Sequence, residues 1–411
     1  MPGTSTAEPV SGDDAGPAPA RSRRLGYVPA LDGLRAIAIA LVVLFHYPWK
    51  QKLFAPQRFH GGFLGVDVFF VLSGFLITSL LLEERETTGR VSLVSFYKRR
   101  ARRLLPAFFV LFVIAVLWRE ALHHSQPNST GLTGMFFYVA NWVQIWRPDS
   151  IGGVFGHTWS LAIEEQFYLL FPLLLVGLFR LGLRRVGIAI TLFAGALAAW
   201  GWRVAVWREQ LHPRISFVDW YALITGRSLP SDDPFRFREW NRWYFGTDTR
   251  ADALLIGCVA AVVFLELARR NPPRWFGRVA ATVGVLAFAG AGVIVERAII
   301  PSGWIPDWGL FLLETCVALT VLGITLAPRA PLTRVLSLRP LVWIGRRSYA
   351  IYLFHLVLFQ ELPPKRTHLS PTLQFFFMMV MILVAAEVSW RLVESPFMRG
   401  RRRFEQVPAS T

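Results

Sequence analysis

Long apolar segments separated by short polar ones recur along nearly the whole of this 411-residue chain. Most have about 18 or more mainly apolar residues, enough for an α-helix to cross the ~30 Å hydrocarbon core of a bilayer. Helices are expected because lipid offers no hydrogen-bond partners, so that the backbone N–H and C=O groups must bond to one another within the segment. The pattern predicts an all-α, polytopic membrane protein with about ten spans, at 28–47, 62–82, 104–119, 159–180, 186–203, 248–268, 276–296, 308–327, 343–361 and 373–393.

A further apolar segment, 132–147, is shorter than the others and contains Asn141 and Gln144. Both amides are poorly suited to a lipid-facing helix. We therefore expect this segment to lie at the membrane interface or to enter and leave on the same side. An eleventh span is the alternative.

The composition agrees with this class, with 54% hydrophobic and 17% charged residues. Residues 1–26 are rich in Ala, Pro, Gly and Ser without an apolar core, which predicts a disordered cytoplasmic tail and no cleaved signal peptide. We expect the membrane domain to cover 27–397 and a basic cytoplasmic tail to cover 398–411. We expect no soluble catalytic domain after the last span.

Lys and Arg outnumber Asp and Glu by 44 to 27, a formal net charge of +17. Most of the basic residues fall in alternate loops, which predicts a plasma-membrane protein with both termini in the cytoplasm. The charges are spread over many segments and form no single patch with interleaved aromatics, so nucleic acid is not an expected partner. Anionic lipid of the bilayer explains most of them. Cys258 and Cys316 both lie in apolar spans, which indicates neither a disulfide framework nor a metal site.

Ionisable residues inside predicted spans are candidates for function, because each costs roughly 2.5–3.5 kcal/mol at the centre of a membrane helix. Arg35 and His46 are eleven residues apart in the first span. On a helix they share one face and lie roughly 16 Å apart along the axis. The alternative is an Arg that reaches the inner headgroups and a His at the outer interface.

The second span carries Asp67 within the glycine-rich segment Gly65–Phe75. Glycines allow neighbouring helices to approach closely, so Asp67 requires a partner within the bundle, and His46 is a candidate. The alternative is a hydrated Asp at the outer end of the span.

A basic segment precedes the third span. Arg99 and Arg103 are i,i+4 neighbours on a helix and, with Arg100, form a guanidinium clamp suited to phosphate groups. A basic collar that only sets topology is the alternative.

The fourth span opens with Trp159 and carries Glu164 and Glu165, which point about 100° apart on a helix, so that one of them faces a given cavity. Arg250 and Asp252 begin the sixth span. In the ninth, Ser348, Tyr352 and His355 form a polar stripe at i, i+4 and i+7, which we expect to face the bundle interior.

These segments, in this order, resemble the acyltransferase type 3 family, which includes O-antigen acetylases and macrolide acyltransferases. The similarity extends over nearly all of 27–397. The matching segments are Leu31-Asp32-Gly33-Leu34-Arg35 with His46, Gly65–Phe75, Arg99-Arg100 with Arg103 and Pro106, Trp159-Ser160-Leu161 with Glu164 and Gln166-Phe167-Tyr168, and Ser348-Tyr349 with Tyr352 and His355.

The resemblance implies transfer of an acyl group, usually acetyl from acetyl-CoA, to a hydroxyl of a carbohydrate or glycosylated metabolite. In the family the first Glu after the Trp-Ser-Leu motif is the expected one, which favours Glu164. Many family members carry an additional extracytoplasmic SGNH-type domain, which we do not expect here.

We accordingly expect His46 to act as general base, oriented by Glu164 or Asp67, with acyl-CoA as the donor. A route in which His46 is itself acylated fits the same residues. The expected catalytic residues are His46, Glu164, Arg35, Asp67 and His355, the expected CoA-binding residues Arg99, Arg100 and Arg103, and the expected substrate-binding residues Ser73, Trp159, Tyr352, Arg250 and Asp252. We expect no metal.

A secondary transporter or flippase for a glycolipid or small metabolite is the competing class, because transporters also bury charges at mid-membrane. No corresponding motif pairs connect 28–203 with 248–393, which favours the enzyme. The aromatic residues of the 204–247 loop suit either sugar stacking or an interfacial belt.

Overall fold

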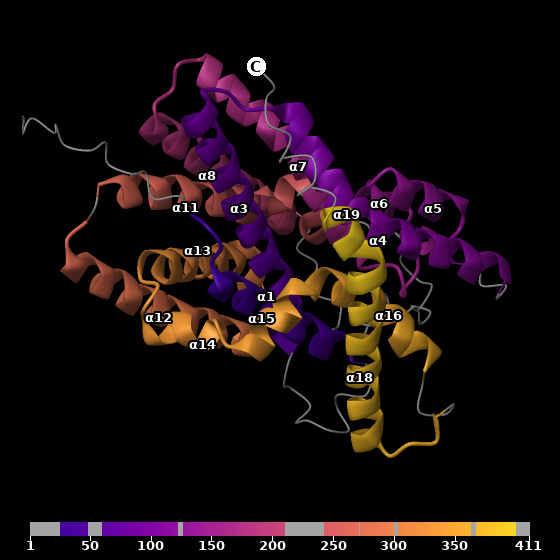
Figure 1. The fold of residues 1–411 in the computed structure, drawn as a ribbon. Coiled ribbons are helices and arrows are strands. Elements are labelled where there is room, and N and C mark those ends of the chain that lie inside the picture. The colour runs from indigo at the N-terminus through magenta and orange to yellow at the C-terminus, as the bar shows by residue number, and fades with distance from the viewer. Residues whose placement is uncertain are drawn as a thin grey trace, which may run out of the picture.

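The computed structural model describes residues 25–47, 60–121, 126–209, 242–270, 272–299, 303–362 and 367–399. The predicted terminal tails and most of the 204–247 loop lie outside these ranges. The described part is helical and contains no strand (Figure 1). Nine of its helical segments are long and apolar enough to cross a membrane. The prediction of an all-α, polytopic membrane protein is confirmed.

The long helices are α1 (Pro29–His46), α3 (Gly65–Thr88), α4 (Leu93–Ala121), α7 (Thr158–Arg180), α8 (Arg185–Glu209), α11 (Thr247–Arg269), α12 (Arg274–Arg297), α13 (Leu310–Leu326) and α18 (Pro371–Ser389). Shorter α-helices are α5 (Ser129–Phe136), α6 (Ala140–Trp146), α14 (Pro331–Leu336), α15 (Arg339–Arg346), α16 (Ser348–Glu361) and α19 (Ser395–Arg399). Two 3₁₀ segments, η1 (His60–Leu64) and η2 (Pro148–Ser150), and two π segments, η3 (Ile305–Gly309) and η4 (Trp390–Glu394), complete the described elements.

The predicted span 343–361 is divided into α15 and α16, which have 8 and 14 residues. The division falls at two consecutive arginines, Arg346 and Arg347, whose side chains bind residues in different parts of the chain. Arg346 donates to the hydroxyl of Tyr27 at 2.7 Å, and Arg347 forms an ion pair with Glu387. One straight helix through both arginines would carry these charges into its apolar part, so the chain turns here.

The segment 132–147 forms the two short helices α5 and α6, neither long enough to cross a bilayer. Its two amides are buried against protein. Asn141 donates to the carbonyl of Phe245 at 3.0 Å, and Gln144 donates to the carbonyl of Gly156 at 2.6 Å. These bonds attach α6 to the segments that begin α7 and α11.

Helix α11 is at the centre of one half of the bundle, where it packs against α3, α8 and α13, and α12 covers α13. The contact with α3 depends on two glycines. A Cβ on Gly74 would lie 1.9 Å from the carbonyl oxygen of Leu254, and one on Gly257 would lie 2.1 Å from that of Val71. The two backbones therefore touch, as the glycine-rich segment predicts.

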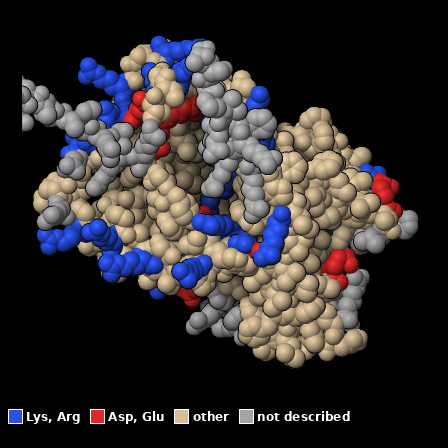
Figure 2. Space-filling model, viewed as in Figure 1, with Lys and Arg blue, Asp and Glu red and all other residues tan. Residues whose placement is uncertain are grey.

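Helices α16 and α18 form the other side of the molecule and pack against each other, and α1 contacts both α3 and α16 (Figure 1). Charged side chains gather around a hollow in the face drawn in Figure 2, whereas the surface over α18 is largely uncharged. Only 22% of the most apolar window of this C-terminal helix is buried inside the protein, which fits a lipid-facing helix.

Candidate active site

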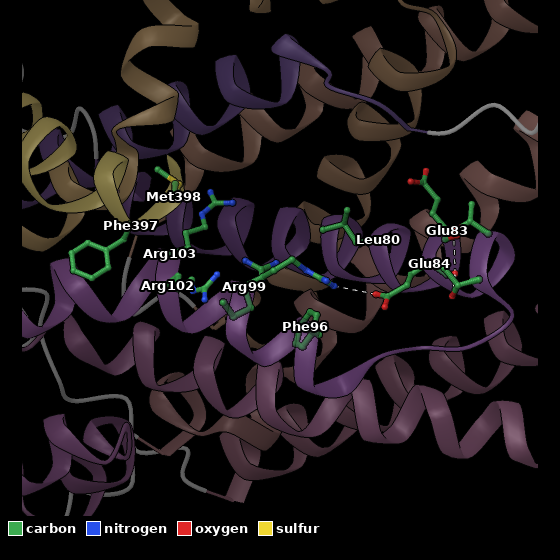
Figure 3. A pocket seen from close by; sticks show the side chains of 12 residues that line it. Leu80, Glu83, Glu84, Phe96, Arg99, Arg102, Arg103, Phe397 and Met398 are labelled. Carbon is green, nitrogen blue, oxygen red and sulfur yellow. Dashed lines mark hydrogen bonds and ion pairs between the residues drawn. The ribbon is translucent and has the colours of Figure 1, made fainter. Parts of the chain in front are cut away.

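A cavity of about 710 Å³ opens at the end of the bundle where α3 ends and α4 begins. Figure 3 shows the arginines of α4 on one side, glutamates of α3 on the other, and α19 closing a third side. The lining residues are Leu80, Glu83, Glu84, Thr87, Thr88, Phe96, Arg99, Arg100, Arg102, Arg103, Phe397 and Met398. The volume lies in the usual range for binding a small molecule or cofactor.

Helix α4 brings four guanidinium groups to this cavity, and two of them, Arg99 and Arg103, are one helical turn apart. Arg99 pairs with Glu84 at 3.0 Å, and Arg100 lies over the ring of Tyr168 at 4.5 Å. Four arginines face two glutamates, so the cavity is electropositive overall. It can bind an anion with several phosphate groups.

Both described chain ends lie at this cavity. The backbone N–H of Leu25 donates to Glu83, and Phe397 lies on the opposite wall. The described part of the chain therefore enters and leaves the bundle at the same end.

A second, smaller pocket has a volume of about 70 Å³. Arg100 and Arg103 line both spaces, so the two spaces adjoin at these arginines. The pocket lining brings together the predicted Arg35, Ser73, Glu164 and Tyr352. Its other lining residues are Val66, Phe69, Phe70, Leu104, Ser160, Leu161, Tyr168, Ser348 and Tyr349.

Three polar side chains of the pocket form one directed hydrogen-bond chain. Ser73 donates to Glu164 at 2.6 Å, and the hydroxyl of Tyr168 lies 3.0 Å from the Ser73 oxygen. Because the single Ser73 proton goes to the carboxylate, Tyr168 is the donor in the second bond. Glu164 is thus placed in the pocket wall by side chains from α3 and from its own helix.

The inner end of the pocket is closed by two hydroxyls and one carbonyl. The Tyr352 oxygen lies 2.6 Å from that of Ser160 and 3.0 Å from the carbonyl of His157, and the Ser160 oxygen lies 3.2 Å from the same carbonyl. Two protons serve three contacts, so one hydroxyl donates to the carbonyl and the other to its neighbour. This hydroxyl triangle of Ser160, Tyr352 and His157 joins α16 to the start of α7.

Beyond the triangle, His46 and His355 face each other with ring centres 5.1 Å apart. Nδ1 of His46 lies 2.9 Å from the carbonyl of Val42, and Nδ1 of His355 lies 2.8 Å from the carbonyl of Tyr352. Carbonyls only accept, so each Nδ1 carries the proton. Nε2 is then the basic nitrogen of each neutral ring. Nε2 of His355, 3.3 Å from Nδ1 of His46, shares the His46 proton.

A third histidine, His157, packs its ring 5.4 Å from that of His355. It precedes α7 and lies outside the spanning helix. Burial lowers the pKa of His157 to about 3, because desolvation disfavours the imidazolium and His355 adds to the effect. His157 is therefore neutral at physiological pH.

The predicted partner of Asp67 is wrong. Asp67 forms an ion pair with Arg250, and both side chains are fully buried. A permanently charged guanidinium is a stronger partner for a buried carboxylate than an imidazole is. Glu164 is bound to Ser73, so neither predicted carboxylate orients His46; His355 and the Val42 carbonyl do so.

Three predicted substrate-binding residues lie outside both cavities. Asp252 is buried in an ion pair with Arg203, and Arg250 is the partner of Asp67. Trp159 packs on Phe70, a residue of the pocket wall, with ring centres 6.1 Å apart. Arg250 also lies over the ring of Phe70, at 6.0 Å, so two of the three residues lie directly behind the pocket wall.

Two buried ionisable residues, Arg203 and Glu314, were missed by the sequence analysis. Both have 0% exposure. The signal was present, because each lies in an apolar segment predicted to span the membrane.

Among the described residues, no group of three or more His, Cys, Asp or Glu is arranged to hold a metal ion.

Comparison with known sequences adds to this geometry. A family profile described as "Acyltransferase domain" matches residues 28–390. The O-acetyltransferase OatA of Staphylococcus aureus (strain NCTC 8325 / PS 47) is 32% identical over 398 residues, which are 93% of this chain and 59% of the relative. A relative from strain COL, whose name also contains O-acetyltransferase, is 33% identical over 386 residues, 91% of this chain and 58% of its own length. The chain thus spans about three fifths of the length of these relatives. No solved structure is significantly similar to it.

Proposed function

The chain belongs to the acyltransferase type 3 family, and from this premise we propose that it transfers an acetyl group from acetyl-CoA to a hydroxyl of a carbohydrate or glycosylated metabolite. Membership of this family decides for an acyltransferase over a transporter. The donor, the acceptor and the residues that act on them belong to the proposal.

The observation that supports the proposal is that the arginine-lined cavity and the smaller pocket share Arg100 and Arg103, while the Tyr352 end of that pocket lies near the histidine pair. Arg100 and Arg103 line both spaces, and Tyr352 at the inner end has its ring centre 5.7 Å from that of His355. A ligand with phosphates at one end and a reactive group at the other fits this order of charges. Acetyl-CoA is such a ligand.

In this proposal the arginines of α4 hold the donor phosphates. Arg99, Arg100 and Arg103 are the predicted set, and Arg102 lines the same cavity. Charge-assisted hydrogen bonds from guanidinium to phosphate are among the stronger polar contacts in proteins. The pocket residues Ser73, Glu164 and Arg35 would then lie along the arm that carries the thioester.

The chemical step is assigned to His46. Its Nε2 takes the proton of the acceptor hydroxyl, the hydroxyl oxygen attacks the thioester carbonyl, the carbon–sulfur bond breaks, and the leaving thiolate of CoA takes that proton back from Nε2. Nε2 of His355 accepts the proton of Nδ1 of His46 and so orients the His46 ring.

The acylated-histidine route uses the same atoms in two stages. The acetyl group would pass from sulfur to Nε2 of His46 and then to the acceptor. A donor cavity at one end of α1 and His46 at the other end support transfer across the plasma membrane, from cytoplasmic acetyl-CoA to an acceptor outside. Both termini are cytoplasmic in this orientation.

The test is transfer by the purified protein in detergent. Acetyl-CoA labelled in its acetyl group is supplied with candidate glycans, and labelled products are identified by mass spectrometry. The proposal requires CoA-dependent labelling of an acceptor hydroxyl without a membrane gradient. Transport of an unmodified glycan into sealed vesicles, without any labelled product, would instead support a transporter.

A further inference from the structure

Five ionisable side chains lie together where α11 meets its neighbours. They are Asp67 on α3, Arg203 on α8, Arg250 and Asp252 on α11, and Glu314 on α13, and each has 0% solvent exposure. None of them lines either cavity. Charges at this depth are costly unless each is compensated, so the charges of this buried cluster must balance.

Two of the three carboxyl groups have a guanidinium as a direct partner. Arg250 donates to Asp67, and Arg203 donates to Asp252. A guanidinium stays protonated in proteins, so each pair is neutral as a whole. Glu314 is the carboxyl group without a pair of its own.

Glu314 receives no hydrogen bond from the residues that the structure describes, and both of its carboxyl oxygens are buried. The nearest cationic atom is Nη1 of Arg203, 3.8 Å from Oε1, which is too far for a hydrogen bond. Nη1 has two protons; one goes to Asp252 and the other to the carbonyl of Thr249 at 3.1 Å. A buried carboxylate anion without donors would be strongly destabilised.

From this balance we infer that the buried cluster binds one proton, which Glu314 holds as a neutral carboxylic acid inside the membrane domain. Three carboxyl groups and two guanidiniums leave one negative charge in excess, and a single proton cancels it. A proton needs no further ligand groups, and among the described residues no group of three or more His, Cys, Asp or Glu is arranged to hold a metal ion.

The charge of Asp252 determines whether Glu314 keeps its proton. Nη1 of Arg203 faces Asp252 by direct contact and Glu314 at 3.8 Å, so this arginine can neutralise either group. If Asp252 loses its charge, Glu314 becomes the carboxyl group beside Arg203 and should release its proton. The charged groups facing Glu314 are Arg203 from α8, Arg250 and Asp252 from α11, and Asp67 from α3.

Infrared difference spectroscopy of the full-length protein tests this site directly. A protonated carboxylic acid has a C=O stretching band that ionised carboxylates lack. At about pH 7, glutamates with an ordinary pKa of about 4.3 are ionised. We expect the spectrum of the native protein minus that of Glu314→Gln to contain an acid band. Glu296→Gln, at an exposed glutamate, is the matched control and should leave the acid region unchanged.

Asp252→Asn supplies an independent arm that keeps Glu314 in place. In this variant we expect the acid band to disappear, because Glu314 then ionises and pairs with Arg203. The inference is overturned if removal of the Glu314 carboxyl leaves the acid region unchanged, or if the band persists in Asp252→Asn. Neither measurement needs an acceptor or acetyl-CoA, so the outcome is independent of the proposed enzymatic activity.

Discussion

Nε2 of His355 lies 3.3 Å from Nδ1 of His46, although the two residues are 309 positions apart in the chain. Each Nδ1 donates its proton to a backbone carbonyl. These bonds fix the tautomer of His46, in which Nε2 is the basic nitrogen. A nitrogen in this state can take the proton of a hydroxyl. The pair therefore connects the first helix to α16, which is part of the ninth predicted span.

Replacing His46 with Ala should lower kcat by about 10²–10⁴-fold, the usual contribution of a general base. The KM for acetyl-CoA should change little, because the proposed phosphate contacts are on α4. Steady-state kinetics with labelled acetyl-CoA measures both values. His368→Asn, at an exposed histidine, is the control and should keep native kcat.

His355→Gln tests whether His355 acts only by holding His46. The substitution should lower kcat and shift the pH profile of kcat, because the tautomer of His46 is no longer fixed. Added to His46→Ala, it should cause no further loss, since coupled residues are not additive. A full additional loss in the double variant would show that His355 has a role of its own.

Replacing Arg100 and Arg103 together with Gln should weaken binding of acetyl-CoA. Each charge-assisted hydrogen bond contributes about 1.5–3 kcal/mol, so the loss of two should raise the Kd by at least about a hundredfold. Titration of CoA by calorimetry in detergent measures it. The same change at the exposed Arg184, which lines neither cavity, should leave the Kd unchanged.

Asp67→Asn should destabilise the fold by about 3–5 kcal/mol, because it leaves the buried Arg250 charge without its partner. Thermal unfolding followed by size-exclusion chromatography detects the loss. The double variant Asp67→Leu with Arg250→Met should recover much of the stability, since both charges are removed together. A double variant no more stable than Asp67→Asn alone would contradict this account.

Acid should destabilise the protein through His157, whose folded-state pKa is about 3 against about 6.5 when unfolded. Between these values the unfolded chain binds one proton more than the folded chain does, so stability falls as pH falls through this window. The slope approaches about 1.4 kcal/mol per pH unit. Unfolding midpoints at about pH 7 and pH 5 measure it, and His157→Gln should show a smaller difference. Equal differences in both proteins would exclude His157 as the cause.

Much of the arrangement along single helices was predictable from the sequence. The polar stripe of Ser348, Tyr352 and His355 is buried as expected, because helical periodicity determines which residues share a face. The same rule placed Arg99 and Arg103 together, and both line the cavity. Hydropathy predicted the positions of the spans because a helix that crosses the hydrocarbon core needs about 20 mainly apolar residues.

Contacts between helices were less predictable. Periodicity does not show which helix lies beside Asp67, and the closer partner proved to be Arg250 of α11 and not His46. Glu314 was missed within its apolar segment, although a single carboxyl there is costly. The division at Arg347 depends on Glu387, a residue of the following helix.

The hydroxyl triangle of Ser160, Tyr352 and His157 has a consequence for the membrane itself. A bundle with an open, positively charged cavity at one end and a histidine pair at the other would be a leak if water filled the space between. Here that space is about 70 Å³ and ends at side chains whose protons are already committed to one another. The triangle therefore lies between the pocket and the histidine pair, so a reactant that passes from one to the other must separate these hydroxyl groups.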